Sequence, residues 1–525
     1  MVINQKSRSA QGLTSSVAME TLESRLMLSA SLSMADFYPL VDLSQYTYSL
    51  KRDDGSSATL VRDVAAGADA GTFALTDTID ATFDSAKLLS RDADGTHLLI
   101  QSWGIFDGDG TQIGTDFLLY DPASPATIFP ATMQVGSEFA DLSSFEHYHT
   151  DSVYDASNPF PDVATIQAMD DLGAGTLAIE VRALGFYDTV VGSGAGRDTF
   201  TTLNLSIGTT MVEQGSQISR DNYVLALSEN FGQVSRSLDW SILSKSGGVT
   251  TRLTGNEQSD LVAGWVPDQA MKHVHVGSKG VSYQDAANNK VTVSITGGGS
   301  GDLFFASDAD LADATSLSMA NTSSRSTFNV TVAKNGTTNI NDVRLHSSLG
   351  TFNAAKLNLL DSFVADSGTG ISTIKFNDVS GEMTLSKTDK MISTNMTFRK
   401  VDALTLQTEG RIGSLSAAAL IDSTIGVGID VGSVDRDNPT LGSEFTEKGA
   451  KNKVTLTTLT LTGLTEAGTT TYMSGTNIAA YGIQTVKFGA KNKTVDDSMI
   501  RTTLQSKITN APVTALADWF TKIPA

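Results

Sequence analysis

The feature that most constrains the fold is a six-residue pattern that recurs in the second half of the chain, with apolar residues at its first, fourth and sixth positions. It begins at Ala314, Ile340, Ile371, Val401, Leu456 and Ile483, with a partial copy at Val431. Successive copies, the partial one included, recur at intervals of roughly 25–31 residues, which is in the range of stacked structural repeats. Such a recurrence in short, β-rich units predicts a right-handed parallel β-helix, in which neighbouring coils stack through inward apolar residues.

Two extra copies of the pattern begin at Leu349 and Ile412, shortly after the main copies at Ile340 and Val401. We expect each of them to form the next face of the same coil. Thr and Ser between the apolar positions suit outward-facing strand sites. A β-sandwich with evenly spaced strands is the alternative, whereas the β-branched content and the lack of long helical periodicity disfavour leucine-rich and helical repeats.

The first half of the chain alternates apolar and polar residues from about Phe37 to Trp240, with turn residues between the runs. The run "THLLIQSWGIF" lies between "DADG" and "DGDG", which is a strong hairpin pattern. No helical segments separate the runs, so we expect an antiparallel β meander or half-barrel-like domain. The connection over residues 141–163 is predicted to be the one large irregular loop.

These patterns divide the chain into five segments. They are an export or targeting segment over 1–35, an antiparallel β domain over 36–245, a transition with a Gly-rich linker over 246–302, β-solenoid repeats over 303–496, and a helical cap or tail over 497–525. In the tail, Met499, Leu504 and Ile508 have helical spacing, and so do Leu516, Trp519 and Phe520 beyond Pro512. A solenoid needs its last coil covered, which is the role expected of this tail.

The overall composition excludes several classes of function. The 37 basic and 58 acidic residues give a net charge of −21, which argues against nucleic acid or an anionic membrane as a partner. The absence of cysteine excludes disulfides, thiolate metal sites and cysteine nucleophiles. No run reaches the ~18 apolar residues of a transmembrane helix. The remaining composition, rich in Gly, Ser, Thr, Ala and Asp, favours a bacterial exported protein.

Two His-x-His pairs are the weak candidates for a metal site. They are His147 with His149, flanked by Glu146 and Asp151, and His273 with His275 in an expected strand. Residues i and i+2 of a strand face the same side, so either pair suits Zn²⁺ or Cu²⁺. The motif is short and arises by chance, so solvated strand or loop histidines are the favoured interpretation.

Calcium is the other candidate cofactor. Asp92 and Asp94, and Asp107 and Asp109, resemble fragments of Ca²⁺-binding loops, and "GGSGD" at Gly298 resembles part of a secreted calcium-binding repeat. None continues to the later acidic ligand that such sites need. Hairpin turns and a linker explain these segments, so no cofactor is expected.

Catalytic motifs of the common hydrolase, metalloprotease and nucleotide-binding classes do not occur in the sequence. Some β-helices cleave polysaccharides with carboxylates clustered on one face. The candidate carboxylates here, Asp378, Asp402, Asp430 and Asp435, are scattered along the chain. A carbohydrate-active enzyme, either a lyase or a hydrolase, is therefore an alternative rather than the favoured function.

The N-terminal stretch "LESRLMLSA" resembles the LEPR-XLL N-terminal domain, whose core reads L-E-P-R-x-L-L-S-A. The matching positions are Leu22, Glu23, Arg25, Leu28, Ser29 and Ala30. Ser24 replaces the proline of that core, and Met27 replaces a leucine. The family is an N-terminal tag on exported or cell-surface proteins, often long and repeat-rich, of environmental bacteria. The resemblance implies a location and no activity.

Two looser resemblances cover the rest of the chain. "FYPL", "YTYSL", "FLLYDPASPATIFPATMQVG", "GFYDTVVGSGAG" and "ENFGQV" are similar to lipoprotein-carrier-like half-barrels, which hold apolar material in a curved sheet. "GRIGSLSAAALIDSTIGVGIDVGSV" is similar to solenoid arrays of surface proteins. The first resemblance implies a lipid or small-ligand carrier as a further alternative.

The favoured function is a non-catalytic structural or interaction protein, extracellular or on the cell surface or envelope. The solenoid would present long faces lined with Thr and Ser to an envelope or extracellular polysaccharide, or to another protein, as in adhesion. Binding would come from many weak polar contacts along the stacked coils.

Overall fold

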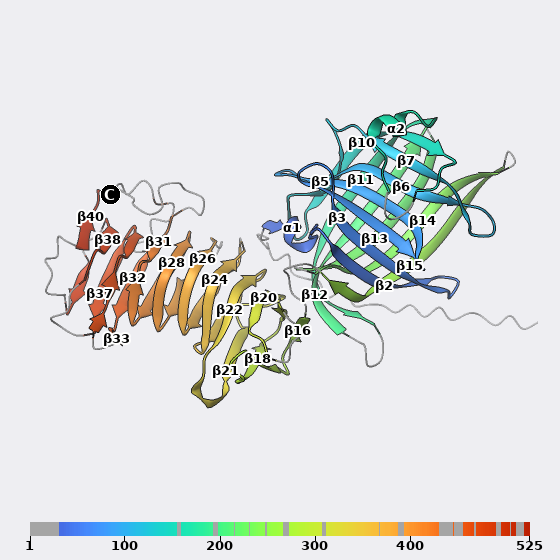
Figure 1. Cartoon of the computed structure of the whole chain (residues 1–525). Helices are drawn as coiled ribbons and strands as arrows, with labels where there is room; N and C mark the ends of the chain where they lie inside the picture. Colours follow the sequence, from blue (N-terminus) through green and yellow to red (C-terminus); the bar gives the residue numbers. More distant parts are fainter. Residues whose placement is uncertain are drawn as a thin grey trace, which may run out of the picture.

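The computed structural model describes residues 31–154, 159–192, 198–214, 216–229, 231–246, 249–265, 272–306, 311–366, 368–386, 393–429, 445, 455–466, 469–489, 495–503, 506–510 and 519–524. Within these residues the chain is an all-β protein with two units (Figure 1). A barrel-like antiparallel sheet comes first, and a solenoid of about seven parallel stacked turns follows it. The targeting motif from Leu22 to Ala30 lies outside the described residues.

Twelve of the described strands form the barrel. They are β2 (Ser44–Arg52), β3 (Ser57–Ala66), β4 (Thr72–Ile79), β5 (Thr82–Arg91), β6 (Gly95–Phe106), β7 (Gln112–Tyr120), β10 (Glu138–Thr150), β11 (Asp170–Val191), β12 (Asp198–Glu213), β13 (Ser216–Ser228), β14 (Gly232–Ser246) and β15 (Val249–Trp265). Each pairs antiparallel with its neighbours, and the ring closes where β15 meets β2 and β5 meets β6. The predicted antiparallel meander is therefore confirmed, and it forms a closed ring.

Two features of the barrel differ from the sequence prediction. The first ten residues of the predicted irregular loop, 141–150, are instead part of a strand, because β10 runs from Glu138 to Thr150 and pairs with both β7 and β11. Its Asp, Ser and His residues resemble a loop in sequence, but a barrel strand can carry polar residues on its inner as well as its outer face. The barrel also passes the expected boundary at residue 245, since β15 is needed to close it.

A short N-terminal segment covers the end of the barrel that faces the solenoid. Strand β1 (Ser31–Ser33) pairs with β9 (Thr132–Gln134), and helix α1 (Met34–Phe37) follows it. Leu32, Met34 and Phe37 belong to the same apolar core as the barrel strands. Two further elements belong to the barrel unit: β8 (Ala126–Pro130) pairs with β6, and α2 (Val163–Gln167) buries Ile166 in a small cluster with Phe117 and Tyr148.

The solenoid has two long sheets, so each coil contributes a strand to both. The first sheet contains β16 (Lys272–Val276), β19 (Ser300–Phe305), β20 (Ala314–Ala320), β22 (Thr338–Leu345), β24 (Leu357–Ala365), β26 (Asp378–Leu385), β28 (Lys400–Thr408), β31 (Thr424–Val427), β36 (Asn477–Ala480), β38 (Met499–Thr502) and β40 (Phe520–Lys522). The second contains β17 (Val281–Gln284), β18 (Lys290–Thr296), β21 (Thr327–Val332), β23 (Leu349–Ala354), β25 (Ile371–Phe376), β27 (Ser393–Thr397), β29 (Arg411–Ala417), β32 (Leu456–Leu461), β37 (Ile483–Phe488) and β39 (Lys507–Thr509).

The solenoid begins with antiparallel pairs and then becomes parallel. β16 to β21 pair antiparallel within their sheets, and every later step from β20 to β40 and from β21 to β39 is parallel. The run "TGGGSG", expected to be a linker, is instead the corner between β18 in one sheet and β19 in the other. Gly297, Gly298 and Gly299 all have positive φ there, and a side chain at Gly299 would meet Thr322.

Each coil contains fewer residues than the spacing between copies of the six-residue pattern predicts. Leu345 pairs with Ala365 in the next coil, and Leu349 pairs with Ile371. One coil is therefore near the lower limit for stacked repeats, which is about 20 residues. The six-residue pattern occurs on both sheets, with Ile340 in the first and Ile371 in the second, so some of the steps between copies join one face to the other. The expected pairing of faces within one coil is confirmed, since Ile340 and Leu349 lie in β22 and β23.

The predicted helical tail is wrong for the residues that the structure describes beyond 496. Met499–Thr502, Lys507–Thr509 and Phe520–Lys522 are strands that extend the two solenoid sheets. Trp519 is buried and contacts Phe488 at a ring distance of 5.6 Å. Residues 504–505 and 511–518 of this tail lie outside the described part. Among the described helices, none is long and apolar enough to cross a membrane.

Candidate functional site

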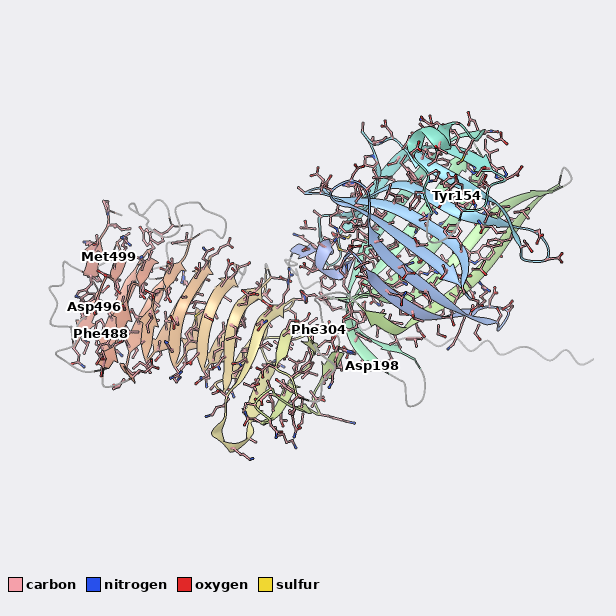
Figure 2. The ribbon with its side chains drawn as sticks, in the orientation of Figure 1. Tyr154, Asp198, Phe304, Phe488, Asp496 and Met499 are labelled. Atoms are coloured by element: carbon pink, nitrogen blue, oxygen red, sulfur yellow. The ribbon has the colours of Figure 1, made fainter. Side chains whose placement is uncertain are left out.

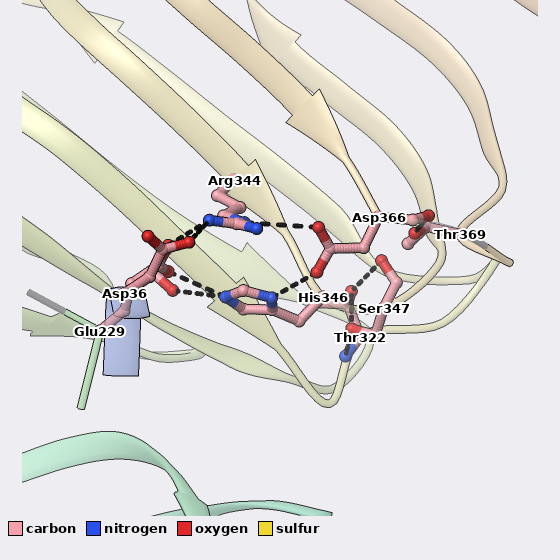
Figure 3. Close-up of polar contacts among 9 residues, drawn as sticks. Asp36, Glu229, Thr322, Arg344, His346, Ser347, Asp366 and Thr369 are labelled. Atoms are coloured by element: carbon pink, nitrogen blue, oxygen red, sulfur yellow. Dashed lines mark hydrogen bonds and ion pairs between the residues drawn. The ribbon is translucent and has the colours of Figure 1, made fainter. Parts of the chain in front are cut away.

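The barrel and the solenoid meet at a buried cluster of charged side chains (Figure 3). His346, on the solenoid just after β22, lies between two carboxylates: its Nδ1 is 2.6 Å from Asp366 Oδ2, and its Nε2 is 2.8 Å from Glu229 Oε2. Glu229 follows the barrel strand β13, whereas Asp366 follows the solenoid strand β24. The imidazole therefore joins the two units through a hydrogen bond on each side.

Arg344, two residues earlier in β22, adds a second set of bridges. Its Nε lies 3.3 Å from Asp366 Oδ1, and its Nη1 lies 3.4 Å from Glu229 Oε1. It also forms an ion pair with Asp36 in α1. Two cationic groups thus face three carboxylates from both units, which is the balance that buried charges require.

Aromatic rings cover the charged cluster on the barrel side. His346 stacks on Phe186 of β11, with ring centroids 4.7 Å apart and planes 17° apart, and Phe37 of α1 lies 5.4 Å away. Because these rings exclude water, the charges interact more strongly than they would at the surface.

The carboxylates keep His346 protonated. Burial alone would lower its pKa, but Glu229 and Asp366 outweigh burial and raise the pKa to about 9. Burial would likewise raise the pKa of Glu229, yet His346 and Arg344 lower it to about 2. The cluster is therefore a set of charged hydrogen bonds near neutral pH, which favours a fixed junction over acid–base chemistry.

A second polar cluster at the same junction contains the predicted pair His273 and His275, both on β16. His273 stacks on Phe200 of β12 at 3.9 Å, and its Nε2 lies 3.1 Å from the Thr199 carbonyl oxygen. His275 Nδ1 lies 2.9 Å from Asp302 Oδ1. Burial would lower the pKa of His275, but this hydrogen bond and the negative charges of Asp302 and its neighbours together raise it. Both histidines thus serve the junction, and neither is the solvated strand residue that the sequence favoured.

Asp302, which ends the "GGSGD" segment, is the central acceptor of this second cluster. It is 1% exposed, and its Oδ2 accepts a hydrogen bond from the backbone N–H of Thr201 in the barrel at 2.7 Å. Phe304, two residues later, packs against Phe231 and belongs to the barrel core. Figure 2 labels Phe304 and Asp198 where the two units meet.

The other predicted pair, His147 and His149, lies on the inner face of the barrel. Asp116 bridges the two rings, at 3.4 Å from His147 Nε2 and 2.6 Å from His149 Nδ1. Glu213 lies 3.0 Å from His147 Nδ1. Asp116 and Glu213 come from β7 and β12, and are therefore distant from the histidines in the sequence. Asp151, which flanks the pair in the sequence, lies 3.4 Å from His149 Nε2. His147 is 8% exposed, so the expectation of a solvated residue is wrong for it.

The remaining predicted site residues have local structural partners. Asp92 Oδ1 accepts hydrogen bonds from the backbone N–H groups of Asp94 and Gly95, and Asp107 does the same for Asp109 and Thr111, as hairpin turns require. Asp378 forms an ion pair with Arg399 and Asp402 with Lys400, whereas Asp430 and Asp435 lie outside the described residues. In the described part of the chain, no group of three or more His, Asp or Glu residues is arranged to hold a metal ion.

The most densely connected residues, Glu229, Arg344, His346 and Asp366, did not emerge from the sequence. They are single charged residues with no motif, and only the docking of the two units brings Glu229 to the other three, which lie more than a hundred residues later in the chain. One pattern does point to two of them, because Arg344 lies in the repeat copy "INDVRL" and His346 directly follows that copy. The chain matches no protein-family model, no curated protein and no solved structure.

Proposed function

We propose that this chain is a non-catalytic, exported or cell-surface interaction protein, in which the second sheet of the solenoid binds a repeating polymer such as an envelope or extracellular polysaccharide. The observation that carries the proposal is a column of polar side chains in register on that sheet. Its members are Thr327, Thr351, Thr373, Asn395, Ser414, Thr458 and Thr485.

A second column runs beside the first, two residues further along each strand. It contains Asn329, Asn353, Lys375, Thr397, Ser416, Thr460 and Lys487. Apolar side chains such as Phe352 and Ile374 point inward between the columns. Neighbouring members of a column are about 4.8 Å apart and the columns about 6.6 Å apart, because strand pairing and strand rise fix these distances. Such a periodic array of donors and acceptors suits a ligand that is itself periodic.

The buried junction supports an interaction protein because it holds the barrel to one end of the array. Contacts that are individually weak add along a rigid surface, since each one raises the effective concentration of the next. The resemblance of residues 22–30 to an export tag supports a location outside the cell.

Sedimentation of the full chain with insoluble polysaccharides, including cellulose and chitin, tests the proposal. Thr373→Tyr would interrupt the column and is expected to weaken binding by about tenfold or more, as several contacts on either side are lost. Thr384→Tyr is the matched control, because Thr384 lies on β26 of the other sheet. Equal binding by both variants, or cleavage of the polysaccharide, would contradict the proposal. Antibody labelling of intact cells tests the location separately.

A carrier of a small polar ligand is the second candidate, which narrows the lipid or small-ligand carrier that the resemblance implied. The inner face of the barrel carries Arg62, Asp77, Lys87 and His147, and such groups do not suit a lipid tail.

A further inference from the structure

The barrel interior changes character along its length. At the end that faces the solenoid, inward side chains are apolar and fully buried, among them Leu203, Leu205, Leu225 and Leu227. Towards the opposite end, the inward positions of the same and neighbouring strands hold Asp221, Arg236, Glu257 and Lys87, which are only partly buried. Cross-strand pairing fixes these directions, since Leu225 lies opposite Arg236 and Leu75 opposite Lys87.

The boundary between the two halves is a buried ion pair. Arg62 binds both oxygens of Asp77, with Nε–Oδ1 at 2.7 Å and Nη2–Oδ2 at 2.8 Å. Its Nη1 donates to Gln233 Oε1 at 3.0 Å, which connects β3 and β4 to β14. Arg62, Asp77 and Gln233 are all buried. The pair is therefore satisfied, and it forms a polar floor beneath the polar groups of the far half, whereas Leu60 and Ile79 continue the apolar core beyond it on β3 and β4.

Above this floor, several donors have no acceptor among the described residues. Gln233 Nε2 and Arg236 Nε are buried and form no hydrogen bond, and the same holds for Ser259 Oγ, directly opposite Arg236. Lys87 forms no hydrogen bond or ion pair with the described part of the chain. Burial and the charges of Arg62 and Arg236 lower the pKa of Lys87, against the opposing effect of Asp77 and Asp221. Native proteins rarely leave buried donors unpaired, because each one loses its hydration without compensation.

Side chains in this half of the interior also remain partly accessible to solvent. Lys87, Gln101, Asp221, Arg236 and Trp240 all point inward and all retain accessible surface. A ring of eight strands is about the size that side chains can fill, and twelve strands enclose a wider space. Accessible space, an apolar base and convergent polar groups are the properties of a small-molecule site.

We propose that the far half of the barrel interior binds a small organic anion, with a carboxylate or phosphate group held by Lys87, Arg236 and Gln233. The unpaired groups that converge there are donors, so the missing partner is an acceptor. An oxyanion accepts hydrogen bonds from guanidinium, ammonium and amide groups together. Asp221 and Glu257 lie on the same inner face, with Glu257 Oε2 3.7 Å from Arg236 Nη2. These acids limit the charge that the site tolerates, which favours a small ligand over a polyanion.

Calorimetric titration of the full chain with succinate and with inorganic phosphate tests this site. Lys87→Met is expected to weaken binding of the better probe by about tenfold or more while keeping the melting temperature unchanged or higher, because a partly buried unpaired cation is replaced by an apolar chain of similar length. Lys51→Met is the matched control, since Lys51 is exposed on the outer face of β2.

Gln233→Leu provides a second variant that changes no charge. It is expected to weaken binding of the anion without altering how the binding affinity depends on salt concentration. Failure of wild type to bind either probe would overturn the proposal. Equal affinity of wild type, Lys87→Met and Lys51→Met would overturn it too, because the anion would then bind adventitiously. None of these outcomes depends on polysaccharide binding by the solenoid, so the two proposals succeed or fail separately.

Discussion

The two units solve the problem of an enclosed β interior in different ways. In the solenoid, the two sheets lie close enough for inward side chains to meet, since Phe363 of β24 contacts Phe352 of β23 and Phe376 of β25, with ring centroids 5.4 and 5.9 Å apart. In the barrel, the interior is wider, and Arg62, Asp77 and Lys87 lie on its inner face. An inward-facing position therefore does not by itself require an apolar residue. Whether a polar side chain is tolerated there depends on the distance to the opposite wall.

The largest expected effect comes from placing one charge in both interiors. Ile374 is 0% exposed, so Ile374→Lys would bury an unpaired ammonium and destabilise the solenoid by about 5 kcal/mol or more. Met211→Lys on the inner face of β12 is expected to cost less than about 1 kcal/mol, because Met211 is partly exposed. Urea unfolding with hydrogen exchange of β12 and β25 measures both. Similar costs would show that the two interiors do not differ.

A smaller effect is expected from a cavity in the solenoid. Phe352 contacts Phe328, Phe363 and Phe376, so Phe352→Ala is expected to cost about 3–5 kcal/mol. Leu360→Ala, at a residue that is 48% exposed in the same region, is expected to change stability by less than about 0.5 kcal/mol. Hydrogen exchange of β23 and its neighbours reports the loss. A cost below about 1 kcal/mol would mean that the coils close over the cavity.

The junction between the two interiors is the next most sensitive point. Glu229→Gln leaves His346 and Arg344 with one carboxylate fewer, and breaking a buried ion pair costs about 3 kcal/mol. Glu382→Gln is the control, since Glu382 is exposed on β26. Small-angle scattering is expected to show a broader distribution of distances for the junction variant only. An unchanged profile together with unchanged stability would show that the aromatic contacts alone hold the units.

The sequence predicts the regular, repeated structure of the two units, and it misses the features that depend on contacts between distant residues. Periodicity identifies the solenoid because similar coils impose one pattern, as in "ISTIKF" and "IQTVKF". It overestimates the coil length, since the same pattern serves both sheets. Strand β10 resembles a loop in the sequence because polar residues such as Asp141 and His147 interrupt the alternation of apolar and polar positions. The groups that pair with these two residues, Thr127 and Asp116, lie on other strands. The role of His273 likewise depends on Thr199, in a barrel strand that is distant in the sequence.

The smallest expected effect is the response of the junction to pH. The folded-state pKa of His346 is about 9, above its unfolded value of 6.5, so its stabilising contribution is complete below pH 6.5 and is lost as the pH rises through 9. Glu229 acts in the opposite direction, with a contribution present above pH 4.5 and lost only as the pH falls towards 2. Between about pH 7.5 and 8.5, the cluster around His346 should therefore weaken by about 1 kcal/mol, with no opposing change from Glu229.

Hydrogen exchange of β22 and α1 at these two pH values, corrected for the intrinsic exchange rate, measures this change. The same measurement on β25, which lies in the apolar solenoid and contacts no titrating junction group, provides an internal reference. In His346→Gln the pH response of β22 should disappear, although its protection is lower throughout, because glutamine does not titrate. If β22 lost protection equally in wild type and His346→Gln, the change would belong to another group, and Arg344 alone would account for the charge of the junction.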